Sequence, residues 1–178
     1  MGRIIGIYGV IGGIIVAIGT YAGMAAVPDG GGTIGMVVGY LTMLIALSMV
    51  FVGVRQYRNE VNGGIIRFWP AFGVGLGIAC VAALFYVLAW EVYMYQTNYT
   101  FMDVYVGKSI EAMQAAGKPA VEVAKFETEM AAFKAQYANP LFRMVTTFME
   151  IAPVALLVPL LSAALLRNSK LLPAKQAR

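Results

Sequence analysis

The chain has 178 residues, of which 60% are hydrophobic and 12% are charged, and its formal net charge is +4. Soluble domains average about 45–50% apolar and about 25% charged residues, so this composition excludes an ordinary soluble domain and indicates a multipass membrane protein. Histidine is absent and Cys80 is the single cysteine. This excludes an internal disulfide, a cysteine-based metal cage and the usual haem and zinc ligands, and we expect no cofactor.

Long uncharged stretches predict the membrane spans. Residues 4–28, 30–54 and 68–90 carry no charge, and a fourth apolar stretch lies between Arg143 and Arg167. At about 1.5 Å rise per residue, each is long enough to cross a bilayer as a helix. We therefore expect an all-α membrane protein, a four-transmembrane-helix bundle within one membrane domain over residues 1–178. The spans are predicted at about residues 4–27, 33–54, 66–92 and 144–166.

Basic residues lie at the ends of these stretches, which sets the orientation and argues against nucleic-acid binding. Arg3, the arginines of residues 55–67 and the basic tail at 167–178 fall on one side of the membrane if four helices alternate. The connection at residues 27–33 has no basic residue and one acid, Asp29. By the positive-inside rule, both termini and the basic tail are therefore expected in the cytoplasm.

The segment between the third and fourth spans, about residues 96–140, predicts an extracytoplasmic amphipathic helix hairpin. Lys118-Pro119 begins a helix and Asn139-Pro140 ends it, and a shorter helix at 109–116 precedes it and ends at Gly117. Apolar side chains recur in the longer helix at spacings of 3, 4, 3 and 4 and form one seam: Val123, Phe126, Met130, Phe133 and Tyr137. The seam has to be covered by the bundle, by the bilayer interface or by another chain, so a homo-oligomer or a membrane protein partner is one alternative.

Small residues mark the faces on which the spans can approach one another, because lipid gives helices no hydrophobic reason to associate. The first span has one such face, and Gly12, Gly19 and Gly23 form a second small patch beside it, which suggests two neighbouring helices. The predicted helix-packing positions are Gly6, Gly9, Gly13, Gly35, Gly39, Gly73 and Gly77.

Glu91 stands near the outer end of the third span. On a helical projection it shares a face with Gly73, Gly77, Cys80 and Leu84, which predicts that its side chain points into the bundle. The alternative is a side chain that reaches the outer interface, within a belt of aromatic residues.

The fourth span contains an acid, Glu150, where lipid would be expected. An ionised carboxylate about two turns inside a span costs roughly 2.5–3.5 kcal/mol on insertion scales unless it is neutral, paired or facing a polar cavity. Pro153 and Pro159 each remove a backbone hydrogen bond, so a helix break is expected beside the acid. Because the third and fourth spans run in opposite directions, Glu91 and Glu150 are predicted to lie at similar depth and to meet near the outer leaflet.

These residues define a candidate intramembrane polar site, formed by Glu91, Glu150, Arg143, Thr146 and Thr147. One interpretation is a structural lock, in which Glu150 and Arg143 satisfy one another with help from the two threonines. The other is a proton or cation site, or an anchor for a polar lipid head group.

The sequence shows no Ser-His, Cys-His or metal constellation, so we expect no enzyme. The leading hypothesis is a structural or interaction module of the membrane, with the lipid bilayer as its surroundings. The alternative is a small proton- or cation-coupled carrier that uses Glu91 and Glu150, and a lipid-acting enzyme that uses the same acids is a third and weaker one.

Short motifs along most of the chain carry a resemblance to a known family. They are Gly39-Tyr40, Met43-Leu44, Leu47-Ser48, Phe51-Val52-Gly53-Val54-Arg55, Tyr57-Arg58, Gly63-Gly64-Ile65, Tyr86-Val87, Trp90-Glu91, Asn139-Pro140-Leu141, Phe148-Met149-Glu150, Pro153-Val154 and Ser162-Ala163. In these motifs the chain resembles the bacterial family called domain of unknown function 4199. The resemblance implies a small multipass protein of the bacterial cytoplasmic (inner) membrane with no assigned activity, and it brings no role for Glu91 or Glu150.

Overall fold

The computed structural model describes residues 1–26 and 32–173, and this part of the chain is helical without strands. Asp29 and residues 174–178 of the predicted tail lie outside the described residues. The helices are α1 Gly2–Ala26, α2 Gly32–Gln56, α3 Phe68–Gln96, α4 Phe101–Ala115, α5 Ala120–Tyr137 and α6 Pro140–Leu166, and a π-helical turn, η1 Tyr57–Val61, continues α2.

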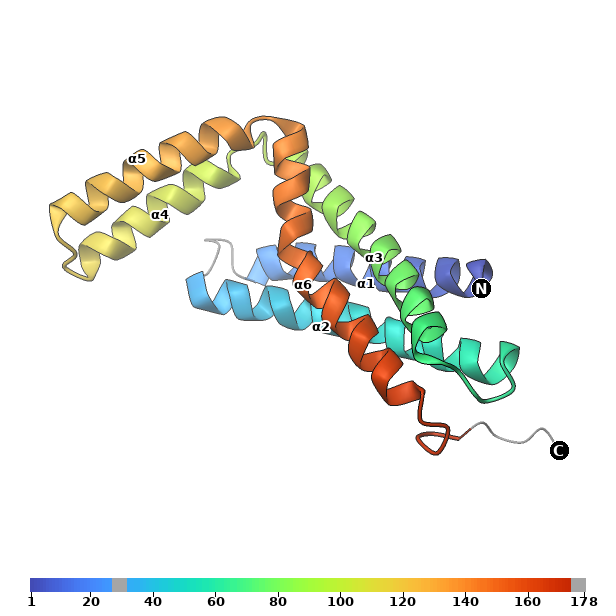
Figure 1. The fold of residues 1–178 in the computed structure, drawn as a ribbon. Helices are drawn as coiled ribbons and strands as arrows, with labels where there is room; N and C mark the ends of the chain where they lie inside the picture. Colours follow the sequence, from blue (N-terminus) through green and yellow to red (C-terminus); the bar gives the residue numbers. More distant parts are fainter. Residues whose placement is uncertain (27–31, 174–178) are drawn as a thin grey trace.

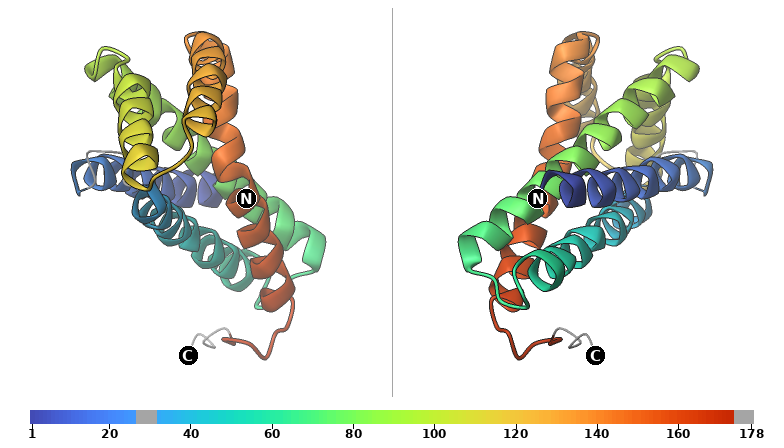
Figure 2. Two further views of the ribbon diagram at one scale, coloured as in Figure 1. Left: turned by 90° about the vertical axis from the view of Figure 1, so that its left-hand side faces the viewer. Right: turned by 90° about the vertical axis from the view of Figure 1, so that its right-hand side faces the viewer.

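Four of these helices, α1, α2, α3 and α6, are long and apolar enough to cross a membrane, which confirms the predicted multipass architecture. α1 and α2 run side by side and cross α3 and α6 (Figure 1). α4 and α5 form a hairpin that projects from the end of the bundle opposite the N-terminus (Figure 1). The C-terminal end of α1 and the N-terminal end of α2 lie on the same side of the molecule as this hairpin (Figures 1 and 2).

Glycines on two sides of α1 allow it to pack closely against two helices. A Cβ added at Gly9 would lie 2.6 Å from the Cβ of Val81, and one at Gly13 would lie 2.5 Å from the ring of Phe85, both on α3. On the other side, a Cβ at Gly12 would lie 3.0 Å from a backbone carbonyl of α2. Since real Cβ atoms do not approach other atoms so closely, the backbones reach these distances only because the side chains are absent.

Other predicted packing glycines do not make such contacts. A Cβ added at Gly6 or Gly39 would meet no heavy atom within 4 Å, and one at Gly73 would touch only the terminal methyl of Met1 at 3.9 Å. Gly77 does pack closely, against Ile5 of α1 at 2.9 Å. Gly35, like Gly39, lies beside an open cavity, which is described below.

The predicted bundle-facing side of α3 needs correction. Cys80 is exposed and Leu84 is 57% exposed, so the projected face that contains them points partly outward. The buried side of α3 instead consists mainly of alanines and branched residues: Ala71, Val74, Ile78, Ala79, Ala82, Ala83 and Tyr86. Alanine is small enough to serve the same close packing as glycine, which a projection of glycines alone leaves out.

The predicted helix break in α6 is also wrong. α6 runs from Pro140 to Leu166 through both Pro153 and Pro159. Pro159 is fully buried, and a Cβ added at Gly75 of α3 would lie 3.1 Å from the Cβ of Pro159. The proline ring therefore occupies space that Gly75 leaves free, and this packing supports α6 where Pro159 removes a backbone hydrogen bond.

In the extramembrane hairpin, the apolar seam of α5 is covered by the chain itself. Val123 and Tyr137 are buried and the other three seam residues are half-buried, against α4 and the start of α6. α4 begins at Phe101, earlier than the predicted 109, because Phe101, Met102 and Val106 extend its apolar side. The seam is therefore not the free surface for a partner that the sequence suggested.

Arg58 joins the end of α2 to the end of α6, a contact that sequence reasoning missed. Its side chain is fully buried, and Nη1 donates to the carbonyl oxygens of Leu171 at 2.9 Å and Leu166 at 3.4 Å. Nη2 donates to the carbonyl oxygen of Leu172. Carbonyls at a helix C-terminus lack intrahelical donors, so a buried cation there satisfies them and is satisfied in turn.

Candidate functional site

A bidentate ion pair connects α3 to α6 near the base of the hairpin. Arg143 donates from Nε to Glu91 Oε1 at 2.7 Å and from Nη2 to Glu91 Oε2 at 2.6 Å. The Arg143 side chain is 3% exposed and that of Glu91 is 15% exposed. Both oxygens of the carboxylate are thus occupied by one guanidinium, which is the strongest geometry available to such a pair.

Arg143 also contacts the segments on either side of the hairpin. Its Nη1 donates to the backbone carbonyl of Tyr137, the last residue of α5, at 3.1 Å. Its guanidinium carbon lies 5.0 Å from the centre of the Tyr99 ring, in the turn between α3 and α4. We call this set, Arg143 with Glu91, Tyr99 and Tyr137, the Arg143 node. The node links α6, α3 and both ends of the hairpin.

A second contact strengthens the same junction. The indole Nε1 of Trp90 donates to the hydroxyl of Tyr137 at 2.7 Å. Burial raises the pKa of the Tyr137 phenol, so the group stays protonated and neutral. Tyr137 therefore contributes a hydroxyl to Trp90 of α3 and a carbonyl to Arg143 of α6.

Glu150 has a different partner from the one predicted. It accepts a hydrogen bond at Oε2 from the hydroxyl of Tyr86 on α3 at 2.9 Å, and it does not bind Arg143. Thr146 and Thr147 donate to carbonyls of their own helix, those of Phe142 and Arg143, each at 2.9 Å. The predicted lock of Glu150 with Arg143 and the two threonines is therefore wrong.

The two acids also do not meet. Glu150 lies two helical turns beyond Arg143, roughly 10 Å along the axis of α6. Tyr86 and Arg143 bind the two carboxylates separately, so the pair of acids forms two sites at different depths. Tyr86 was the residue that sequence reasoning missed, and its signal was present, since it is the only tyrosine within residues 68–90.

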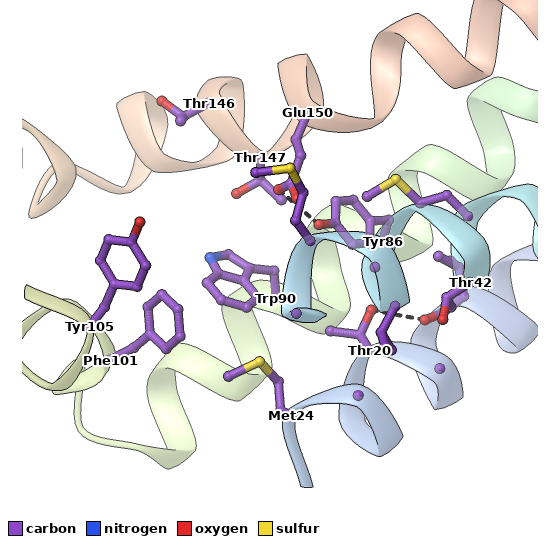
Figure 3. Close-up of a pocket in the computed structure, with 18 of the residues that line it drawn as sticks. Thr20, Met24, Thr42, Tyr86, Trp90, Phe101, Tyr105, Thr146, Thr147 and Glu150 are labelled. Atoms are coloured by element: carbon purple, nitrogen blue, oxygen red, sulfur yellow. Dashed lines mark hydrogen bonds between the residues drawn. The ribbon is translucent and has the colours of Figure 1, made fainter. Parts of the chain in front are cut away.

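Glu150 faces a cavity at the hairpin end of the bundle, with a volume of about 380 Å³. All six α-helices contribute to its wall, α1 and α2 on one side and α3, α6 and the base of the hairpin on the other. Figure 3 shows Glu150 and Tyr86 at one part of the wall and the rings of Trp90, Phe101 and Tyr105 at another. Glu91 does not contribute to this wall, and Glu150 is the one charged side chain among the described residues that do.

A second cavity, of about 440 Å³, lies beside the Arg143 node and contains Arg143 and Lys134. Both cations are already paired within the chain, Arg143 with Glu91 and Lys134 with Asp103. The positive charges on the wall of this second cavity are therefore neutralised by carboxylates of the same chain. Among the residues that the structure describes, no group of three or more His, Cys, Asp or Glu side chains is placed to hold a metal ion.

Comparison with known proteins gives a family but no activity. A family model described as a protein of unknown function (DUF4199) matches residues 7–168. No curated protein and no solved structure matches the chain.

Proposed function

The chain belongs to the DUF4199 family, proteins of unknown function, and we propose that it is a non-enzymatic structural or interaction module of the bacterial cytoplasmic membrane. In this role, the four spans hold the α4–α5 hairpin in a fixed position outside the membrane, with both termini in the cytoplasm. The Arg143 node is the observation that carries the proposal. One buried guanidinium contacts α3, the last residue of α5 and the turn that precedes α4.

Two features of the hairpin support a role in interaction. Its apolar seam is covered by the chain itself, and Lys134 of α5 pairs with Asp103 of α4. Its outer faces carry charged pairs with exposed side chains, including Lys118 with Glu122 and Lys125 with Glu129. A rigid hairpin with a charged outer face can present a surface to a second copy or to another membrane protein.

The position of the hairpin can be measured with two spin labels. In a Cys80→Ser background, Val121→Cys labels the tip of the hairpin and Leu84→Cys labels α3, and both native side chains are exposed. In proteoliposomes we expect one narrow distance distribution, and we expect it to broaden in Glu91→Gln, because that change weakens the ion pair. Glu122→Gln, in an exposed pair of the hairpin, is the matched control and keeps the narrow distribution. A distribution that is equally broad in all three proteins would contradict a fixed hairpin.

The interaction itself is tested by photo-crosslinking in intact membranes. A photoreactive residue at position 121, on the hairpin tip, is expected to give a defined adduct larger than the monomer. The same residue at position 157, on the exposed and apolar side of α6, is the control for random collisions in the bilayer. Only monomers at every hairpin position would argue against the interaction role.

The carrier remains a second candidate because Glu150 lies on a cavity while Glu91 is held by Arg143. Such a carrier would use Glu150 alone as its proton- or cation-binding carboxylate. The test is flux of protons or monovalent cations in proteoliposomes. Loss of flux in Glu150→Gln supports this candidate, and flux that is unchanged in that variant excludes the role of Glu150.

A further inference from the structure

The cavity beside Glu150 contains one carboxylate, and only one oxygen of that carboxylate accepts a hydrogen bond from the described residues. Among the described residues, the one hydrogen bond to this carboxylate comes from Tyr86, at Oε2. A carboxylate accepts up to about four hydrogen bonds, so Oε1 is available to a donor. No other charged side chain is among the described residues of the cavity wall, so nothing within it neutralises Glu150.

Several donors of the wall are already committed to the protein. Thr20 donates to the carbonyl of Val16, and Thr146 and Thr147 donate to carbonyls of α6, as described above. The indole N–H of Trp90 donates to Tyr137. An anion would be repelled by Glu150, whose carboxylate can only accept hydrogen bonds. The wall favours a ligand that donates hydrogen bonds or carries positive charge.

Aromatic rings lie on the same cavity. Trp90 and Phe101 meet edge to face with ring centres 4.9 Å apart, and Phe101 stacks with Tyr105 at 6.2 Å. Figure 3 shows the three side chains grouped on one side of the cavity. These rings give the cavity an apolar surface apart from Glu150, which suits the body of an amphiphilic ligand.

We propose that this cavity binds an organic cation with an apolar body, that is, an amphiphile whose ammonium group pairs with Glu150 and whose apolar body extends into the part of the cavity lined by the rings of Trp90, Phe101 and Tyr105. The apolar body would also lie along α2, where Gly35 and Gly39 contribute no side chain to the wall. The volume of about 380 Å³ suits a head group with a few carbons or a small aromatic amine, and is within the range of about 300–1,000 Å³ for ligand pockets. The site is separate from the Arg143 node and requires no transport.

The probe is benzyltrimethylammonium, and its control is neopentylbenzene, a neutral molecule of nearly the same shape. Binding is measured in a maltoside detergent, which has no ammonium group and imposes no gradient. The chain has two tryptophans, and in a Trp69→Phe background the fluorescence of Trp90 reports on the cavity alone. Trp69 is 74% exposed, so this change leaves the core intact. We expect saturable binding of the cation, at least about tenfold tighter than that of the neutral molecule.

Two substitutions separately test whether the charge of Glu150 and the open volume of the cavity are needed for binding. Glu150→Gln removes the charge and is expected to weaken cation binding by about tenfold or more without changing the binding of neopentylbenzene. Gly39→Leu fills the cavity, since a Cβ at this position meets no heavy atom within 4 Å, and is expected to weaken binding of both probes. Glu122→Gln, on the exposed face of the hairpin, should leave both affinities unchanged. Thermal unfolding of each variant shows that it is folded, and Gly39→Leu provides the test if Glu150→Gln does not fold.

The proposal would be overturned by no saturable binding of the cation, by equal affinity for the cation and the neutral probe, or by an unchanged cation affinity in a folded Glu150→Gln variant or in Gly39→Leu. The source of the ammonium group is distinguished by competition with short-chain lipids. Competition by phosphatidylethanolamine and not by phosphatidylglycerol identifies a lipid head group as the occupant. Competition by neither supports a free amine, whereas equal competition by both would show that the ammonium group is not what the site recognises and would reject the proposal.

Discussion

Two acids in neighbouring spans have different surroundings and therefore different consequences for the protein. Glu91 is held by two of the three nitrogen donors of one guanidinium, in a contact that is almost closed to solvent. Glu150 has one neutral partner, Tyr86, and faces an open cavity. A buried ion pair gives a defined orientation more reliably than it gives stability, because the cost of desolvating both charges offsets most of their attraction. We therefore propose that Glu91 positions the helices and that Glu150 is the acid that can bind a ligand.

Breaking the ion pair on one side should be much worse than replacing both partners. Glu91→Leu leaves the buried Arg143 without its carboxylate, and we expect it to lower the free energy of unfolding by about 3–5 kcal/mol. The double variant Glu91→Leu with Arg143→Met should recover most of this loss, since it buries apolar groups in place of both charges. Denaturant unfolding in mixed micelles measures both.

The exposed pair of Lys118 with Glu122 provides the control for this comparison. Glu122→Gln is expected to change the free energy of unfolding by no more than about 1 kcal/mol, because exposed pairs contribute little. If Glu91→Leu were as mild as the control, the Arg143 node would not hold the helices together.

The residues of the site were partly predictable from the sequence. Their spacing placed Arg143, Thr146, Thr147 and Glu150 together on the fourth span, but spacing within one helix does not reveal which side chain of another helix each will meet. The depth of a partner depends on how far α3 is shifted along α6, and that shift is set by packing contacts such as Gly75 against Pro159. For this reason Arg143 was assigned to the wrong acid and Tyr86 was missed.

At the level of helices, small residues decide where α1 meets its neighbours. Gly9 and Gly13 face side chains of α3, and Gly12 faces the backbone of α2. The sequence predicted two such contact sides on α1, but it could not separate the glycines that touch another helix from those that do not. Gly6 and Gly39 follow the same small-residue pattern and lie in open space. The helix ends were more predictable, because Pro119 and Asn139-Pro140 fix the limits of α5 by backbone geometry.

Matched alanine substitutions on α1 separate these two kinds of glycine. Gly13→Ala places a methyl group 2.5 Å from the ring of Phe85, so we expect a loss of about 1–3 kcal/mol in the free energy of unfolding. Gly6→Ala meets no atom and should be neutral or stabilising by up to about 1 kcal/mol, since alanine favours a helix over glycine. The difference is measured by unfolding in detergent. Equal effects at the two positions would show that α1 does not approach α3 as closely as described.

For the whole molecule, four spans place the N-terminus, the α2–α3 connection and the end of α6 on one side, and the hairpin with the Glu150 cavity on the other (Figure 1). Apolar length predicted the number of spans, because backbone groups in lipid have to be satisfied within a helix. Composition does not predict the cavity, because its wall is formed by residues of six helices that are far apart in the sequence.

The orientation that we propose from the basic residues can be measured by thiol labelling. In a Cys80→Ser background, Val121→Cys reports on the hairpin and Val61→Cys reports on the connection after α2, and the native valines are 80% and 54% exposed. Because Arg55 and Arg67 flank this connection, we expect it to face the cytoplasm. A membrane-impermeant maleimide should then label residue 121 in intact cells and residue 61 only after permeabilisation. Leu157→Cys, on the exposed apolar side of α6, should react in neither condition, because lipid disfavours the thiolate. Labelling of residue 61 but not of residue 121 in intact cells would invert the topology and place the Glu150 cavity on the cytoplasmic side.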